Sequence, residues 1–236
     1  MRRLLASALA TAAVAACATA VTAPAAHADP AAISSVSVKP ALAVQTKVNK
    51  QKINVEVRTS TGVDSVTADL QARVGDGQMF VILKEVQPGV WQGWDYLYNW
   101  EAAGTWTADI EASDYDSDAG DVKKTSSFQV RRGTYVSGFK ASPGKVRKGK
   151  AISVSGSLKG LGSYGEYYGL KKGKIVVYFK RKGTKSWVKY GTVTTGSGGK
   201  FLKKFKAKTS GYWLARYDGT GYWYRSYSAG KGVVVR

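Results

Sequence analysis

The feature that most constrains the fold is an alternation of apolar and polar residues with a period of two. Residues 53–57 place Ile, Val and Val at alternate positions, and Ile152 and Val154 repeat the pattern. A β-branched and aromatic run occupies residues 174–180. Clusters of Gly, Ser, Asn and Asp recur about every 8–12 residues, a spacing typical of sandwiches and barrels. Beyond residue 28, no long stretch has the 3.6-residue period of a helix, so the sequence predicts an all-β fold.

The first 28 residues have the anatomy of a secretory signal peptide. Arg2 and Arg3 give a cationic start, an Ala-rich apolar stretch follows, and small residues precede a cleavage site after Ala28. The apolar stretch is shorter than the ~20 residues of a spanning helix, and nothing later reaches that length, so no transmembrane segment is expected. We therefore predict secretion. The alternative is a lipoprotein, since Cys17 ends a lipobox-like Val-Ala-Ala-Cys.

Cleavage after Ala28 would remove Cys17 and His27, the only Cys and the only His of the chain. The mature chain would then have no thiol nucleophile, no disulfide and no imidazole base. Ser-His-Asp catalysis and zinc sites built on His or Cys are excluded on the same grounds. Paired carboxylates remain, but none has a recognisable catalytic context. We therefore expect that this protein is not an enzyme.

A weak internal repeat divides the mature chain into two halves. In each half a proline precedes an alternating strand, and a Gly two residues before a Trp opens a later one. The separation is 66 residues from Pro40 to Trp106 and 70 residues from Pro143 to Trp213. Two copies of one sandwich explain this repeat, because a domain of this class has about 100 residues.

The two halves differ sharply in charge. Residues 29–133 carry 11 Lys and Arg against 14 Asp and Glu, a net charge of −3, whereas residues 134–236 carry 23 against 2, a net charge of +21. Such a contrast between adjacent stretches indicates surfaces with separate roles. We predict a signal peptide at 1–28, an acidic immunoglobulin-like β-sandwich at 29–133 and a strongly basic immunoglobulin-like β-sandwich at 134–236.

Short motifs in the second half carry a resemblance to a known family. Residues 139–143 read Phe-x-Ala-Ser-Pro, residues 177–187 read Val-x-Phe-Lys-x-Lys-Gly-Thr-x-x-Trp, and residues 211–213 read Gly-Tyr-Trp. These motifs resemble the Ig-like repeat of secreted actinobacterial (Streptomyces-like) proteins. The first half, with Trp106 and Asp114, is similar to the partner domain of those proteins. The resemblance implies tandem Ig-like domains, export and no assigned reaction, and such proteins are sometimes labelled calcium-binding.

An acidic segment at residues 114–121 is the candidate metal site. Asp114, Asp116, Asp118 and Asp121 could converge on Ca²⁺, which takes about six to eight oxygen ligands. The segment departs from an EF-hand loop, since it has Ala at the sixth position and Thr at the twelfth. The alternative is a solvated hairpin in which Asp and Gly supply turn geometry. We expect no resident cofactor, with calcium as the only candidate ion.

The basic half has its cations in clusters. With two acids to offset them, the clusters produce a positive field that attracts polyanions at long range. The alternative is solubility and protection of sheet edges, which requires far less charge. No nucleic-acid-binding motif accompanies the charge, so we expect an anionic wall polymer or another polyanion rather than sequence-specific nucleic acid. The candidate polyanion-binding residues are Lys145, Arg147, Lys148, Lys150, Lys180, Arg181, Lys182, Lys200, Lys203, Lys204 and Lys206.

Aromatic residues form three groups with different expectations. Trp106 and Trp213 follow a Gly in alternating strands and are expected in the core. The rings at alternate positions within residues 94–100 share one strand face, either as core or as one continuous patch. Exposed rings in Gly-rich loops can stack on sugars. The candidate glycan contacts of this kind are Tyr164, Tyr167, Tyr168, Tyr222, Trp223 and Tyr224.

Together these features predict an exported, non-enzymatic binding or adhesion protein. Its basic C-terminal domain would associate with anionic cell-envelope or matrix polymers. One alternative is a calcium-dependent structural or adhesion protein that uses loop 114–121, and another is a secreted inhibitor. The dependence on salt distinguishes the polyanion-binding hypothesis from the calcium hypothesis, because polyanion binding weakens steeply with salt whereas a calcium site is lost on chelation.

Overall fold

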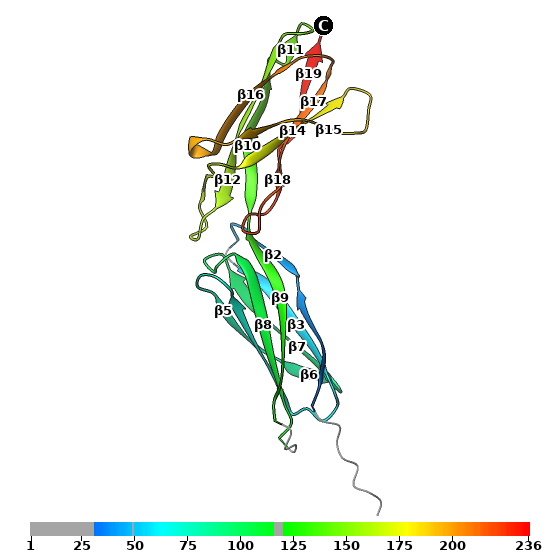
Figure 1. The fold of residues 1–236 in the computed structure, drawn as a ribbon, viewed down its shortest axis with the longest axis vertical. Helices are drawn as coiled ribbons and strands as arrows, with labels where there is room; N and C mark the ends of the chain where they lie inside the picture. The colour runs from blue at the N-terminus through cyan, green and yellow to red at the C-terminus, as the bar shows by residue number, and fades with distance from the viewer. Residues whose placement is uncertain (1–30, 49, 116–119) are drawn as a thin grey trace, which may run out of the picture.

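The computed structural model of the chain describes residues 31–48, 50–115 and 120–236, and it confirms an all-β protein (Figure 1). These residues form 19 strands and one 3-10 turn at Ser197–Gly199. Two tandem immunoglobulin-like sandwiches follow each other along an elongated molecule, with the second toward the C-terminus. The predicted signal peptide at 1–28, with Cys17, lies outside the described residues, as do Asp116 and Asp118.

The first sandwich consists of one sheet with the strand order β1-β3-β7-β6 and another with the order β2-β9-β8-β4-β5. This is the A-B-E-D and G-F-C arrangement of immunoglobulin domains, with β2 added parallel to β9 at one edge of the second sheet and β5 added antiparallel to β4 at the other. The strands are β1 (Ile33–Lys39), β2 (Leu42–Gln45), β3 (Lys50–Thr59), β4 (Ser65–Ala72), β5 (Gln78–Ile82), β6 (Lys84–Gln87), β7 (Val90–Tyr98), β8 (Gly104–Ser113) and β9 (Val122–Arg132).

The second sandwich repeats the arrangement. In one sheet β10, β13 and β16 all pair with β12, and the other sheet has the order β11-β19-β17-β14-β15, with β18 on β17. Pro143 lies between the first two strands of this unit, as Pro40 does in the first unit, so the predicted repeat is structural. The strands are β10 (Thr134–Ser142), β11 (Lys145–Val146), β12 (Ala151–Leu161), β13 (Tyr167–Gly169), β14 (Lys174–Arg181), β15 (Val188–Thr194), β16 (Lys200–Lys206), β17 (Gly211–Tyr217), β18 (Ser226–Tyr227) and β19 (Lys231–Val235).

Each sandwich has its own hydrophobic core, built by the alternation of its strands. In β3 the side chains of Ile53, Val55 and Val57 are buried, and the residues between them point outward. Trp106 and Trp213 are buried in separate clusters, which confirms that both belong to the core. Truncating a buried Trp to Ala typically costs about 3–5 kcal/mol, so each indole is a principal stabiliser of its unit.

The two sandwiches meet at a very short connection. Strand β9 ends at Arg132 and β10 begins at Thr134, so Gly133 alone joins them. The Gly133 amide donates to the carbonyl oxygen of Gln45, at 2.8 Å. A Cβ at Gly133 would lie only 2.8 Å from the same oxygen, so a side chain cannot be accommodated without displacing the backbone. Glycine is therefore required by this close approach.

Arg132 is buried at this junction, with 3% of its surface exposed. Its guanidinium donates to the carbonyl oxygens of Asn99 (2.9 Å) and Glu101 (3.1 Å) in the first unit. It also donates to the hydroxyl oxygens of Ser163 (3.2 Å) and Tyr222 (2.9 Å) in the second unit. One side chain thus connects loops of both sandwiches.

Candidate functional site

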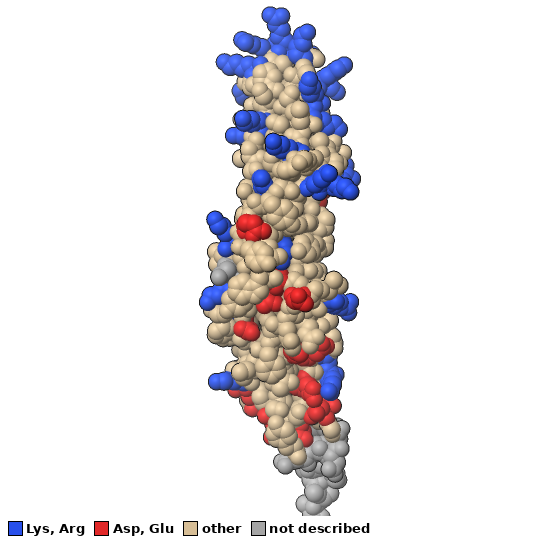
Figure 2. Space-filling model, turned by 90° about the vertical axis from the view of Figure 1, so that its left-hand side faces the viewer, with Lys and Arg blue, Asp and Glu red and all other residues tan. Residues whose placement is uncertain are grey.

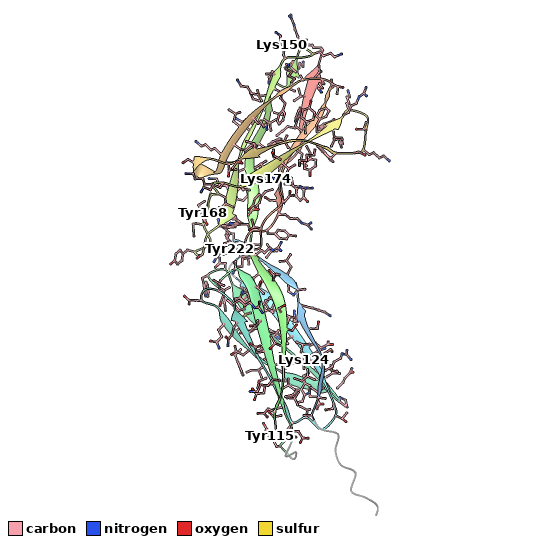
Figure 3. All side chains as sticks on the ribbon, in the orientation of Figure 1. Tyr115, Lys124, Lys150, Tyr168, Lys174 and Tyr222 are labelled. Atoms are coloured by element: carbon pink, nitrogen blue, oxygen red, sulfur yellow. The ribbon has the colours of Figure 1, made fainter. Side chains whose placement is uncertain are left out.

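Charge is distributed unevenly along the molecule. On the face shown in Figure 2, Lys and Arg predominate over the end that bears the second unit, and the visible Asp and Glu lie mainly over the first. Figure 3 shows Lys150 and Tyr115, which follows Asp114 in the acidic segment, at opposite ends of the molecule. The ion pairs among the described residues include only one in the second unit, between Arg216 and Asp218. The lysines of that unit are therefore electrostatically uncompensated, which maximises the field they produce.

Strand β16 presents one group of the predicted cations. Lys200, Lys204 and Lys206 are exposed at alternating positions of the outer face, while Phe201 and Phe205 point toward the core. Small residues of β10 and β12 leave a shallow depression of about 580 Å³ beside them, and the residues that line it include Ser137, Lys140, Ser155, Ser157, Lys200 and Leu202. Hydroxyl and ammonium donors therefore share one open sheet face, as recognition of phosphate or carboxylate groups requires.

Lys203 does not belong to that face. It lies in the phase of Phe201 and Phe205, its ammonium donates to the carbonyl oxygen of Thr192 at 2.6 Å, and its Nζ is 5.9 Å from the ring centroid of Phe205. The four lysines that the sequence grouped within residues 200–206 are therefore three cations on the outer face and one, Lys203, that is hydrogen-bonded to the main chain of β15.

The other predicted cations lie at two further places. Lys145, Arg147 and Lys148 line an open hollow at the C-terminal end of the unit, with Lys150 close by in sequence. Lys180 lies at the end of β14, where its Nζ is 5.1 Å from the ring of Trp187, and Arg181 and Lys182 continue into an exposed turn. The structure thus separates the candidate residues into three groups on one basic unit, a distribution suited to an extended ligand.

The predicted glycan contacts do not form one platform. Tyr164 is 94% exposed, whereas Tyr167 packs edge-on against Tyr135 at 4.8 Å. Burial raises the pKa of both Tyr167 and Tyr168 above the usual value for a phenol.

The remaining predicted rings are partly structural. Tyr222 accepts a hydrogen bond from Arg132, and Trp223 packs against the core of the second unit. Tyr224 is half-buried, with the guanidinium of Arg225 5.8 Å from its ring. Figure 3 places Tyr168 and Tyr222 close to the junction, and the Tyr222 hydroxyl takes part in it through Arg132.

The acidic segment lies at the end of the first unit that is distant from the junction. The Tyr115 amide donates to the carboxylate of Asp64 at 2.8 Å, and the Tyr115 hydroxyl bonds to Ser65. A hydrogen bond from Ser113, with contributions from Glu111 and Lys123, lowers the pKa of Asp121. Among the described residues, no three Asp, Glu, His or Cys side chains gather as metal ligands would. Since Asp116 and Asp118 lie outside those residues, the calcium site stays a prediction.

Two features of the structure were not predicted as sites. One is the Arg132 junction, which the sequence presents as a linker. The other is the outer face of the β1-β3-β7-β6 sheet, where Trp94 is 50% exposed beside a groove. Trp91 and Leu97 take the buried positions of β7, so the rings at positions 94, 96 and 98 form an outward patch rather than core. In this patch Trp94 and Tyr96 meet edge-on at 5.3 Å, and Tyr98 stacks on Trp100 at 4.3 Å.

No protein-family model and no curated protein sequence matches this chain. Among solved structures, it is similar to a DUF4785 family protein from Legionella pneumophila, with 13% identity, a TM-score of 0.43, and coverage of 77% of this chain and 51% of that one. A tetra-tandem repeat of a large adhesion protein matches with 11% identity, a TM-score of 0.34, and coverage of 84% and 48%. The D0-D1 domain of intimin matches with 9% identity, a TM-score of 0.30, and coverage of 86% and 98%.

The chain spans about half the length of the first two of these structures. At such identities and TM-scores the matches carry no functional argument, and the immunoglobulin-like assignment rests on the strand order of the two sandwiches. Within the described part of the chain, no helix has the length and apolar character needed to traverse a bilayer.

Proposed function

We propose that this chain is an exported, non-enzymatic binding or adhesion protein whose basic unit associates with anionic polymers of a cell envelope or matrix. The observation that supports this most is the charge contrast, with +21 on residues 134–236 and −3 on residues 29–133. Export is proposed from the leader-like first 28 residues, and the kinship with secreted actinobacterial proteins from the motifs of the second half.

The arrangement of the cations favours a long, flexible ligand over a small one. Three exposed groups of Lys and Arg on a single unit can each contact a different segment of a polymer. Each contact releases counterions that the polymer had condensed, and this release supplies much of the affinity. A polymer with many phosphates or carboxylates gains from all three groups, whereas a small anion gains from one.

The experiment that tests the proposal is a pull-down of residues 29–236 on purified cell wall, with and without its teichoic acid, over a series of salt concentrations. We expect retention on the intact wall and much weaker retention on the stripped wall. Log affinity should fall linearly with log salt. Equal retention on both preparations, or retention unchanged in ~1 M salt where the Debye length is ~3 Å, would refute a charge-driven association.

A further inference from the structure

The outer face of the β1-β3-β7-β6 sheet carries a groove of about 440 Å³. The alternation of β1, β3 and β7 directs these side chains outward, while Val55 and the apolar residues in phase with it form the core. The groove lies on the first unit, apart from the basic surface proposed above. The residues that determine its chemistry are Trp94, Asn54, Gln92, Lys39, Lys52 and Lys84.

Strand register brings these residues together from distant parts of the chain. Asn54 pairs with Lys39 on one side and with Trp94 on the other, and Gln92 pairs with Lys84 of the edge strand β6. Gly93 permits this arrangement, since a Cβ there would overlap the carbonyl oxygen of Ile82. Strand β7 can therefore pass close to the end of β5, where the chain crosses between sheets and begins β6.

Trp94 supplies an apolar, planar surface to the groove. Trp94 is 50% exposed, and the Nζ of Lys52 lies over its ring at 4.3 Å from the centroid, so a ligand that stacks on that face must displace this ammonium group. The C–H face of a sugar ring packs against such a surface, as flat ligands do on exposed aromatic side chains. The amides of Asn54 and Gln92 lie beside it, and each nitrogen already donates one hydrogen bond, to the carbonyl oxygen of Lys39 (3.5 Å) and to Glu56 (2.9 Å). The second N–H and the carbonyl oxygen of each amide are left for hydroxyl groups of a ligand.

The charge of the groove is opposite to that of its unit. Lys39, Lys52 and Lys84 line it, and the one carboxylate among the lining residues, Glu56, accepts hydrogen bonds from Arg58 (3.1 Å) and Gln92 (2.9 Å). These hydrogen bonds lower the pKa of Glu56 and occupy its oxygens. Three ammonium groups thus face a groove on a unit whose net charge is −3, and they complement a ligand that carries negative charge.

We propose that this groove binds an acidic saccharide, a sugar that bears a carboxylate. The ring stacks on Trp94, its hydroxyl groups meet Asn54 and Gln92, and its carboxylate is held by the ammonium groups of Lys52 and Lys84. The proposal does not rest on the function proposed for the basic unit, because every residue that it uses belongs to strands of the first sandwich.

A matched pair of disaccharides tests the proposal on residues 29–236. The probes are cellobiuronic acid and its neutral counterpart cellobiose, titrated at 150 mM NaCl while the indole resonances are followed by NMR. We expect saturable shifts of the Trp94 indole with the acid and binding at least tenfold weaker with cellobiose. Trp94→Ala should reduce affinity for the acid at least tenfold. Trp100→Ala is the matched control, since Trp100 is also about half exposed but stacks on Tyr98 and does not line the groove.

Further variants separate this site from the basic unit. Lys84→Gln should weaken binding of the acid severalfold and leave any binding of cellobiose unchanged, whereas neutralising Lys200, Lys204 and Lys206 should affect neither. The proposal is overturned if the two Trp variants bind the acid equally, if cellobiose binds as well as the acid, or if neither probe shifts Trp94. None of those outcomes would affect the function proposed for the basic unit, which the wall-binding experiment tests separately.

Discussion

Replacing Arg132 by Ala should uncouple the two sandwiches. The substitution removes four hydrogen bonds of the guanidinium of Arg132, a residue that is 3% exposed. It leaves the carbonyl oxygen of Asn99 without this donor, whereas that of Glu101 keeps the side-chain amide of Gln45. A hydrogen bond to a charged group contributes about 1.5–3 kcal/mol, and burial of the guanidinium costs part of that sum. We therefore expect a net loss of about 3–5 kcal/mol in the free energy of unfolding, in the range typical for a broken buried network.

Differential scanning calorimetry measures this loss directly. A cooperative unit of ~200 residues loses about 2–4 °C in Tm per kcal/mol, so a loss of about 3–5 kcal/mol should lower the Tm of the Arg132→Ala variant by about 6–20 °C. Calorimetry should also resolve two transitions in the variant, as each sandwich unfolds independently. Small-angle scattering should show a broader range of shapes, because only the main chain at residues 132 and 133, with its hydrogen bonds to Tyr222, Tyr224 and Gln45, would then connect the units.

The matched control is Arg147→Ala, which removes the same charge from an exposed position of the second unit. Its Tm should change by no more than ~2 °C, since exposed substitutions usually cost within about 0.5 kcal/mol. If Arg132→Ala behaves like this control in both calorimetry and scattering, then the buried guanidinium does not hold the units together.

Three further outcomes are expected. Replacing Lys200, Lys204 and Lys206 by Gln should weaken retention on anionic wall polymer and lower the slope of log affinity against log salt by about one per lysine that contacts the polymer. Replacing the equally charged set Lys171, Lys185 and Lys189 should weaken retention less, and equal losses in the two variants would show that the field is diffuse. Burial raises the pKa of Glu101, so the folded state holds its proton more tightly than the unfolded state does, and the contribution of this group to stability should be lost as pH rises through the carboxylate range, opposite in sign to the contributions of Glu56 and Asp121. Glu101→Gln should flatten that part of the pH–stability curve, and an unchanged curve in chemical denaturation would contradict the assignment. The intact mass of the exported protein should match residues 29–236, whereas a lipid-modified N-terminus at Cys17 would place it on the membrane.

The alternation of side chains allowed much of the fold to be predicted. Within residues 53–57 the apolar side chains occupy alternate positions only, so the sequence alone predicts which face of this strand is buried. The same rule was available for Lys203, which shares the phase of Phe201 and Phe205, and it would have separated this lysine from its neighbours. In β7 both phases contain aromatic residues, so local sequence could not decide which rings face the core. The pairing of β7 with β3 decides it.

The Arg132 junction could not be predicted, because its ligands come from loops far apart in the chain. Asn99, Ser163 and Tyr222 gather around the guanidinium only once both sandwiches have formed. An arginine next to a glycine between two strands has the composition of a solvated linker. The groove beside Trp94 is hidden for a similar reason, since strand register rather than sequence proximity brings Lys39 and Lys84 together.

A fixed junction changes what two separate binding surfaces can achieve. With a flexible linker, the effective concentration of the second surface averages over many separations, so ligands of many lengths gain some avidity. Here one residue joins the units and the Arg132 side chain bonds to both, so, if Arg132→Ala uncouples them as expected, the native distance between the basic surface and the groove of the first unit is restricted. A polymer that reaches both surfaces must therefore match one span, and shorter polymers bind through one surface alone. Length selectivity would then be a property of the junction and not of either surface, which is why a single buried arginine matters to binding at sites that it does not touch.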